Sequence, residues 1–306
     1  MKHAKTLSFT LFLFAIPHAA VAAGAKAPCQ INVSSSEITA IMNRYVPSGS
    51  NGRGPAGAVY RIGSNGGVAQ SLLERNASVA QPVASTQKIM TAWTAYKFGG
   101  LSRETAFTDS DLFFDEQGNR AVHPDTGRTV LVGEKLNQSE YLYSLIMKSS
   151  NGAAQALGRG AAGSVNAFMT RLNSEAQSLL GANAQSYFQN PSGLTDSSDT
   201  YRFTGTTRRQ QSTASELARI AGAIMKNSGF RSTLESAGVQ GASSGYLYKL
   251  GYTQAAGKTV VATFPLKGSC SSELLSFAFF GSLSDAQFNN YVNLYNELRN
   301  LVWSKL

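Results

Sequence analysis

The sequence predicts an α/β fold in which strands from both ends of the chain enclose a helical middle. Residues 56–62 and 68–75 flank a turn rich in glycine and asparagine and predict a β-hairpin. From about residue 86 to 240 the pattern is mainly helical, with loops between the helices that include a polar insert at residues 108–125. Three more strand-like segments follow at residues 246–253, 258–266 and 274–282. The length of the chain suits two closely packed lobes.

The first residues have the features of a secretory signal peptide. Lys2 and Lys5 precede a mostly apolar run at residues 7–16, and the small residues at 20–22 form an A-x-A cleavage pattern. We therefore expect residues 1–22 to be removed and residues 23–306 to be periplasmic or secreted. No second run of about 18 apolar residues exists that would span a membrane.

The chain is basic, with a formal net charge of +9 that becomes +7 once Lys2 and Lys5 are removed. Export argues against nucleic acid as a partner and favours attraction to an anionic cell wall or membrane surface. The alternative is a positive surface that only maintains solubility.

The few cysteines and histidines limit the kinds of chemistry that the chain can perform. Cys29 and Cys270 are the only cysteines, and in an oxidising compartment we expect them to form a disulfide. Loss of the signal peptide leaves His123 as the one histidine, in a turn-rich segment that predicts a surface loop. Neither cysteine has the spacing of a metal ligand pair, so we expect no metal and no cofactor. A serine–histidine triad is also disfavoured, because no G-x-S-x-G motif is present.

Two terminal helices are predicted around the strands. Ser34 and Glu37 form a capping-box pattern ahead of Ile38, Ile41 and Met42, which indicates a helix at the start of the mature chain. A final amphipathic helix is expected to pack on the sheet with one face formed by Phe288, Tyr291, Val292, Tyr295, Leu298 and Val302.

Ser85 and Lys88 form an S-x-x-K pattern where a segment of small residues gives way to a helix. Residues three apart on a helix share a face, with Cβ atoms about 5–6 Å apart. Lys88 is therefore the nearest base for a nucleophilic Ser85. A free lysine has a pKa of about 10.4, so this role requires burial or a neighbouring cation.

Two further patterns follow in the chain, S-x-N at residues 149–151 and K-x-G at residues 249–251. Each pattern alone is weak. Ser149 and Ser150 are equally typical of helix caps, and Lys249 alone is typical of a solvated strand residue. Only the three patterns in this order carry a specific prediction.

The ordered set S-x-x-K, S-x-N and K-T/S-G is typical of penicillin-binding proteins and serine β-lactamases. The sequence resembles the low-molecular-mass penicillin-binding proteins, which are serine D,D-peptidases, and the likeness extends to residues 132–151, 190–199 and 212–225. The resemblance implies a penicillin-binding-protein/β-lactamase-like fold, with a five-stranded antiparallel sheet, flanking helices and an inserted helical lobe. The sheet lobe would comprise residues of about 30–84 and 241–306, and the helical lobe about 85–240.

The resemblance also implies the catalytic roles. Ser85 would attack a D-alanyl carbonyl and become acylated, while Lys88 accepts its proton. Ser149 would relay the proton to the leaving amine. Lys249 would supply a positive charge that lowers the pKa of Lys88 and attracts the carboxylate of the substrate.

The remaining expected contacts are with the substrate. The resemblance implies that Asn151 binds its backbone amide, that Gly251 belongs to the substrate-binding strand, and that the backbone N–H groups of Ser85 and Tyr252 form an oxyanion hole.

The third motif departs from the family, because Leu250 stands where the family has threonine or serine. A lost hydrogen bond to a charged group costs about 1.5–3 kcal/mol, or roughly 10- to 100-fold in binding or rate. Thr253 shares a strand face with Lys249 and Gly251. We therefore predict Thr253 as the replacement donor.

The resemblance implies an exported enzyme that acts on peptidoglycan stem peptides and cross-links, with β-lactam antibiotics as covalent inhibitors. Ser215, where the larger carboxypeptidases have arginine, and the 36 residues after Cys270 resemble endopeptidase-type members without an extra C-terminal domain. Such members cut D-alanyl–diaminopimelate cross-links, and carboxypeptidase activity is also expected.

Two alternatives remain at this point. Leu250 motivates a catalytically impaired homologue that binds peptidoglycan or β-lactams. A serine β-lactamase or esterase on the same scaffold is the other. A class A β-lactamase is disfavoured because Glu134 precedes the S-x-N motif, whereas the deacylating glutamate should follow it.

Overall fold

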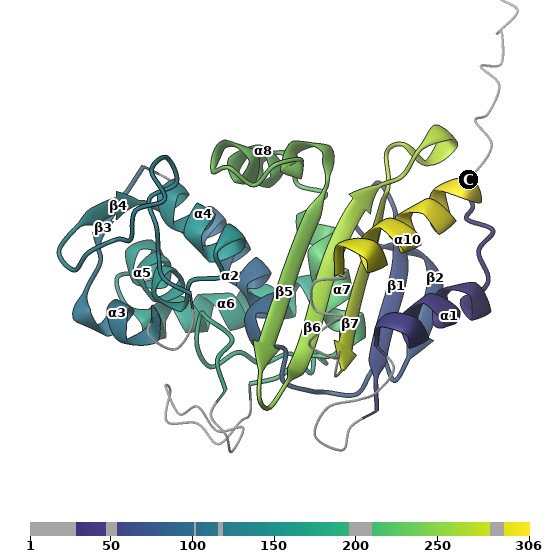
Figure 1. Cartoon of the computed structure of the whole chain (residues 1–306), viewed down its shortest axis with the longest axis horizontal. Coiled ribbons are helices and arrows are strands. Elements are labelled where there is room, and N and C mark those ends of the chain that lie inside the picture. The colour runs from purple at the N-terminus through teal and green to yellow at the C-terminus, as the bar shows by residue number, and fades with distance from the viewer. Residues whose placement is uncertain (1–28, 47–53, 101, 116–118, 196–209, 282–290) are drawn as a thin grey trace, which may run out of the picture.

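The architecture is that of a computed structural model, which describes residues 29–46, 54–100, 102–115, 119–195, 210–281 and 291–306. The signal peptide predicted at residues 1–22 lies outside the described residues. The central feature is a five-stranded antiparallel sheet in the order β2-β1-β7-β6-β5 (Figure 1). Its strands are β1 (Ala56–Ile62), β2 (Val68–Arg75), β5 (Leu247–Thr253), β6 (Gly257–Pro265) and β7 (Leu274–Gly281).

The sheet joins the two ends of the chain because β1 pairs with β7. Ala58 lies opposite Ala278, and Val59 lies opposite Phe277. The predicted hairpin forms between β1 and β2, and β5 pairs with β6 on the far side of β7. The α/β class and the five-stranded antiparallel sheet are confirmed. In the described chain β5 has β6 as its only strand partner, and Figure 1 shows β5 facing the helical elements.

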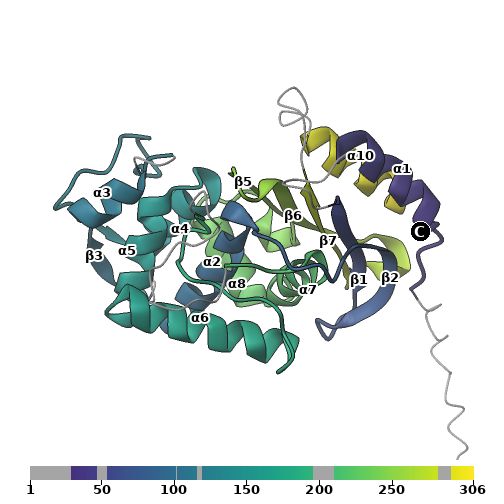
Figure 2. The ribbon, with the colours of Figure 1, turned by 90° about the horizontal axis from the view of Figure 1, so that it is seen from below.

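Helices cover both faces of this sheet. Figure 2 shows α1 (Ser35–Tyr45) and α10 (Tyr291–Ser304) on one face and α7 (Ala214–Ile224) on the other. Gly222 lets α7 approach closely, because a Cβ there would lie 2.5 Å from Ile62 Cγ1. One helix within the range assigned to the helical lobe therefore packs on the sheet, and the boundaries of the two lobes remain a prediction.

The two terminal helices were predicted with different success. The N-cap of α1 is Ser34, whose Oγ accepts from Glu37 N in the predicted capping box. In α10, the predicted buried face is partly wrong. Leu294 is fully buried together with Leu298 and Val302, whereas Val292 is 60% exposed. The i, i+4 spacing of Leu294, Leu298 and Val302 places these three side chains on one buried stripe, which does not include Val292. Phe288 and the Tyr291 side chain lie outside the described residues.

The helical lobe stands beside β5 (Figure 1). Its helices are α2 (Lys88–Phe98), α3 (Asp109–Asp115), α4 (Gln138–Met147), α5 (Asn151–Ala162), α6 (Val165–Leu180) and α8 (Ser228–Ser236). The 3-10 turns are η1 (Ala84–Gln87), η2 (Ala242–Ser244) and η3 (Gly268–Cys270). Among the described residues, no helix combines the length and apolar character needed to cross a membrane.

Two elements of this lobe were not predicted. The short strands β3 (Glu104–Ala106) and β4 (Lys135–Asn137) pair with each other, but three residues are too few to show a strand period. Helix α3 lies in a segment that was predicted to be a polar loop. Its Asp111 is fully buried because Arg159 pairs with it, with an N–O distance of 2.8 Å. Because the buried residue Asp111 is charged, it does not contribute to an apolar helical pattern by which α3 could have been predicted.

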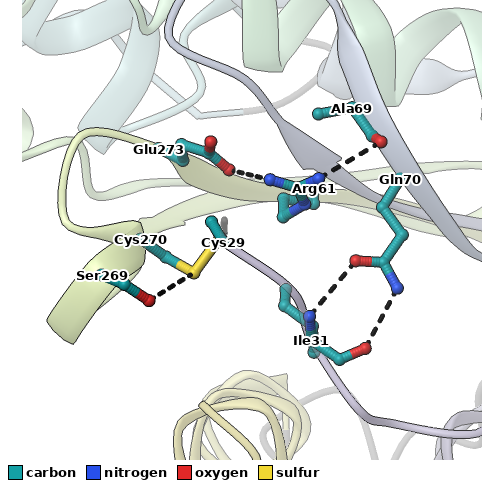
Figure 3. Close-up of a disulfide and its surroundings, with 8 residues drawn as sticks. All are labelled: Cys29, Ile31, Arg61, Ala69, Gln70, Ser269, Cys270 and Glu273. Atoms are coloured by element: carbon teal, nitrogen blue, oxygen red, sulfur yellow. Dashed lines mark hydrogen bonds and ion pairs between the residues drawn. A yellow bond between two sulfur atoms is a disulfide. The ribbon is translucent and has the colours of Figure 1, made fainter. Parts of the chain in front are cut away.

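The segment that enters α1 is fastened to the sheet, as Figure 3 shows. Cys29 is bonded to Cys270, across a sequence separation of 241 residues. The side chain of Gln70 on β2 also bonds the backbone of Ile31, with Nε2 donating to the carbonyl oxygen at 3.0 Å. The start of the described chain is thereby attached both to the β6–β7 connection and to the hairpin.

Candidate active site

The predicted nucleophile Ser85 lies in η1, which leads directly into α2. The preceding residue, Ala84, has φ = 50°, a left-handed conformation that is costly for a residue with a Cβ. Gly193 packs against this turn, since a Cβ there would lie 2.0 Å from the Ala84 carbonyl oxygen. The turn leaves Ser85 partly exposed while its neighbours in the chain are buried.

Lys88 is the first residue of α2, and its side chain is fully buried. Its Nζ lies 2.7 Å from Ser85 Oγ, 2.8 Å from Asn151 Oδ1 and 2.7 Å from the Ser192 carbonyl oxygen. The structure thus brings the serine and lysine of the first motif into hydrogen-bond distance. Asn151 of the second motif completes the group.

Burial lowers the pKa of Lys88 well below its usual value, and the charge of Lys249 lowers this pKa further. Asp115 opposes the shift to a smaller extent. A neutral amine donates two hydrogen bonds and accepts one through its lone pair. Two of its three neighbours are carbonyl-type oxygens, which only accept. The lone pair of neutral Lys88 is therefore directed at the hydroxyl of Ser85.

The two serines of the second motif have different hydrogen-bond partners. Ser150 is the N-cap of α5, and its Oγ accepts from Ala153 N at 2.8 Å. Ser149 has φ = 58°, and its Oγ accepts from Lys249 Nζ at 2.8 Å. The helix-cap interpretation therefore applies to Ser150, whereas Ser149 points toward the third motif.

Asp115, at the end of α3, was not predicted as part of this site. Its carboxylate accepts from Ser150 Oγ, Gly152 N and Ala121 N, each at 2.7 Å. Burial raises the pKa of Asp115, and these hydrogen bonds oppose the shift. Asp115 thus positions the turn that carries Ser149. No sequence pattern indicated this contact, because Asp115 lies in the polar insert that was predicted to be a loop.

The third motif lies on β5. Lys249 is 3% exposed, and its Nζ donates to Ser149 Oγ and to the Leu250 carbonyl oxygen at 2.8 and 2.9 Å. Burial lowers the pKa of Lys249 to about 7. A Cβ at Gly251 would lie 2.8 Å from Ser85 N. Only glycine at this position lets β5 press against the turn that holds the nucleophile.

Thr253 does not line the cleft, although it lies on the strand face that was predicted. Its Oγ1 accepts from Ala256 N at 3.1 Å and lies 3.1 Å from Thr195 Oγ1, so this side chain orders the β5–β6 turn. The geometry gives no support to the prediction that Thr253 replaces the hydroxyl missing at Leu250.

A loop at residues 190–194 supplies one more contact that was missed. The Ser192 carbonyl oxygen accepts from Lys88, and Asn190 Oδ1 holds this loop by accepting from Ser192 N and Gly193 N at 3.0 and 2.8 Å. The family resemblance over residues 190–199 included this loop. It did not indicate that a backbone carbonyl would touch the predicted base.

His123 and Glu134 stay apart from this group of residues. They lie 3.1 Å apart, His123 Nε2 to Glu134 Oε2, in the loop between α3 and β4, and neither lines the cleft. Hydrogen bonds from Arg128, the Leu131 backbone and His123 lower the pKa of Glu134 to about 2. The hydrogen bonds of this carboxylate are therefore made within its own loop.

The three motifs meet in a cleft of about 420 Å³ beside β5. Its lining includes Ser85, Ser149, Asn151, Lys249, Gly251 and Tyr252. The cleft therefore holds a hydroxyl next to a buried amine, a second hydroxyl next to a second amine, and the exposed edge of a strand. A hydroxyl beside a buried amine is the arrangement of a nucleophile and its base.

Sequence comparison relates the chain to a known family. The sequence model of the D-alanyl-D-alanine carboxypeptidase family matches residues 62–237, which include the first two motifs. A D-alanyl-D-alanine carboxypeptidase from Streptomyces sp. (strain K15) is 27% identical over 185 residues. That match spans 58% of this chain and 58% of the relative.

Solved structures share the fold. A D-alanyl-D-alanine carboxypeptidase from Mycobacterium tuberculosis H37Rv has a TM-score of 0.60 and 23% identity, over 85% of this chain and 95% of that chain. Penicillin-binding protein D2 from Listeria monocytogenes, in a cefotaxime-bound form, has a TM-score of 0.56 and 19% identity, over 79% and 95%. Penicillin-binding protein 6B from Escherichia coli has a TM-score of 0.58 and 17% identity, over 83% and 77%. At these identities the likeness establishes the fold.

Proposed function

This chain belongs to the D-alanyl-D-alanine carboxypeptidase family of low-molecular-mass penicillin-binding proteins, and we propose that it is an exported serine D,D-peptidase. It cleaves D-alanyl peptide bonds of peptidoglycan through an acyl-serine intermediate. Its main substrates are the cross-links between stem peptides, with carboxypeptidase activity on uncrosslinked peptides as a secondary reaction. β-Lactam antibiotics acylate the same serine.

The observation that carries this proposal is the position of Lys88. Its buried Nζ lies 2.7 Å from Ser85 Oγ and has two pure acceptors as its other neighbours. Among these three neighbours in the described structure, only Ser85 can give a proton to deprotonated Lys88. A nucleophile with a base at hydrogen-bond distance is the arrangement that covalent catalysis requires.

In the proposed cycle, Ser85 Oγ attacks the D-alanyl carbonyl carbon while its proton passes to Lys88. The backbone N–H groups of Ser85 and Tyr252 stabilise the tetrahedral oxyanion. Ser149 donates a proton to the leaving amine as the C–N bond breaks, which leaves an ester on Ser85. Water then hydrolyses the ester and restores the serine hydroxyl. The edge of β5 that has no strand partner among the described residues offers backbone groups to an extended peptide.

The proposed location rests on two features of the chain. Residues 1–22 have the signal-peptide pattern, and the bond between Cys29 and Cys270 suits an oxidising compartment. We place the enzyme in the periplasm or outside the cell, where its peptidoglycan substrates lie.

The function is tested by intact mass after incubation of the purified mature protein with benzylpenicillin, beside Ser85→Ala. We expect one drug-sized increment on the wild type and none on the variant, together with release of monomers from cross-linked muropeptides by the wild type. Acylation without muropeptide cleavage would instead identify the catalytically impaired homologue. Absence of both reactions in the wild type contradicts the proposal.

The acylation rate is expected to follow a bell-shaped pH profile, in which Lys88 sets the acidic limb and Lys249 sets an alkaline limb near pH 7. Lys88 must be neutral to accept a proton, so the rate rises as pH increases through its depressed pKa. Lys249 must be charged, so the rate falls as pH increases through about 7, the pKa to which burial lowers it. Stopped-flow measurement of benzylpenicillin acylation from about pH 5 to about pH 10 checks this profile. A rate that is still rising at the alkaline end excludes a charged Lys249 as a requirement.

A further inference from the structure

Thr259 on β6 makes a hydrogen bond from the sheet to the turn that carries the nucleophile. Its side chain is fully buried, and its Oγ1 donates to the Val83 carbonyl oxygen at 2.9 Å across a sequence separation of 176 residues. Val83 directly precedes η1. Thr259 is not among the described residues that line the cleft, so its effect on the reaction must pass through the turn.

The Val83 carbonyl oxygen marks the start of this turn. It accepts from Thr86 N at 3.3 Å and from Thr86 Oγ1, both of which belong to the turn itself. Of the three donors that the described structure places on this oxygen, only Thr259 belongs to the sheet. The hydroxyl of Thr259 therefore attaches the turn to β6, whereas the two bonds from Thr86 only close the turn on itself.

The attached turn contains a costly backbone conformation. Ala84, between Val83 and Ser85, has φ = 50°, and a residue with a Cβ keeps such a conformation only where the surrounding structure enforces it. Gly193 packs on the Ala84 carbonyl, and Thr259 holds the preceding carbonyl. The direction of the Ser85 N–H depends on the same turn, because this N–H and the Ala84 carbonyl belong to one peptide group.

The register of the sheet places the Thr259 hydroxyl beside that N–H. Gly251 lies opposite Thr259 where β5 pairs with β6. A Cβ at Gly251 would lie 2.6 Å from Thr259 Oγ1 and 2.8 Å from Ser85 N. The space left by the missing side chain of Gly251 is therefore shared by the hydroxyl and by the start of the nucleophile turn.

We propose that Thr259 is a positioning residue for acylation, which holds the turn so that the Ser85 N–H is directed at the oxyanion. The inference rests on the proposed function, in which this N–H stabilises the tetrahedral oxyanion. Such stabilisation depends on donors that are aimed at the charge before it develops. Without the bond from β6, the turn has one contact fewer to keep Ala84 in its left-handed conformation, and the Ser85 N–H loses part of its alignment.

The test is Thr259→Val, which replaces the hydroxyl with a methyl group of similar size in the purified mature enzyme. Stopped-flow kinetics over a range of benzylpenicillin concentrations separate the dissociation constant of the first complex from the rate constant of acylation. We expect this rate constant to fall about 10- to 100-fold. The dissociation constant is expected to stay at the wild-type value, because Thr259 is not among the cleft-lining residues of the described structure.

Thr263→Val is the matched control. Thr263 lies on the same face of β6, is also fully buried, and donates through Oγ1 to the Gly245 carbonyl oxygen at 2.8 Å. Each valine variant thus loses one buried hydrogen bond to a carbonyl, and we expect thermal unfolding to show a similar decrease in Tm for both. Only Thr259→Val should lower the rate constant of acylation. Thr259→Ser, which keeps the hydroxyl, is expected to acylate at nearly the wild-type rate.

Three results overturn the positioning role: a wild-type rate constant in folded Thr259→Val, an equal fall in Thr263→Val, or a Thr259→Ser enzyme as slow as Thr259→Val. If Thr259→Val does not fold, Thr259→Ala, which puts no methyl group at the position of Oγ1, must give the same fall. A wild type that is not acylated and releases no monomers from cross-linked muropeptides refutes the proposed function, and the positioning role with it. A wild type that is acylated no faster than Thr259→Val refutes the positioning role alone.

Discussion

Lys88→Met lowers the rate of acylation by benzylpenicillin by about 10²–10⁴-fold, the range expected for loss of a positioned general base. Methionine fills the buried volume of the lysine stem but has no lone pair of comparable basicity at the position of Nζ. Ser85 then stays in the same turn with the same exposure to solvent, but it loses its proton acceptor. Stopped-flow acylation kinetics measure the effect directly.

Lys97→Met is the control for this change, because Lys97 lies on the same helix α2 and pairs with Glu175 at 3.0 Å, away from the cleft. We expect this variant to acylate at the wild-type rate. Thermal unfolding of both variants separates a catalytic effect from a loss of folded protein. Wild-type acylation kinetics in a folded Lys88→Met enzyme would assign the base to another group.

Replacement of both Cys29 and Cys270 by serine is expected to lower the free energy of unfolding by about 5 kcal/mol in the loop-entropy model. The size follows from the separation of 241 residues that the bond closes. Without it, the segment before α1 keeps its apolar contacts and the bonds between Ile31 and Gln70, but the unfolded chain gains the freedom of an open loop.

Urea unfolding followed by circular dichroism measures this change. The wild type treated with a reductant serves as the second arm, since reduction should shift its midpoint to that of the double variant and leave the double variant unaltered. Equal midpoints for oxidised wild type and double variant contradict a stabilising role for the bond.

The sequence was a good guide to the sheet and to the order of the motifs. The hairpin of β1 and β2 and the last three strands have strong apolar patterns and clear turns, and they form the predicted sheet. The spacing of Ser85 and Lys88 on one turn placed their side chains together, because helix geometry alone decides that contact.

The missed features depend on tertiary contacts. Asp111 and Asp115 suggest a polar loop until Arg159 and Ser150 are placed beside them. Thr253 has the expected strand face, but the turn that follows engages its hydroxyl. The buried face of α10 depends on how that helix crosses the sheet, which the spacing of its own apolar residues does not fix.

The distribution of the site along the chain has a consequence for biosynthesis. Ser149 and Lys249, which touch in the folded enzyme, are separated by 100 residues. Strand β1 has a partner strand on each side, β2 and β7, only after β7 has been synthesised. Contacts of such long range form late in folding. A chain that emerges amino-terminus first therefore has no complete catalytic site until its final strands arrive. In the exported enzyme that we propose, activity therefore begins only after the last strands have paired.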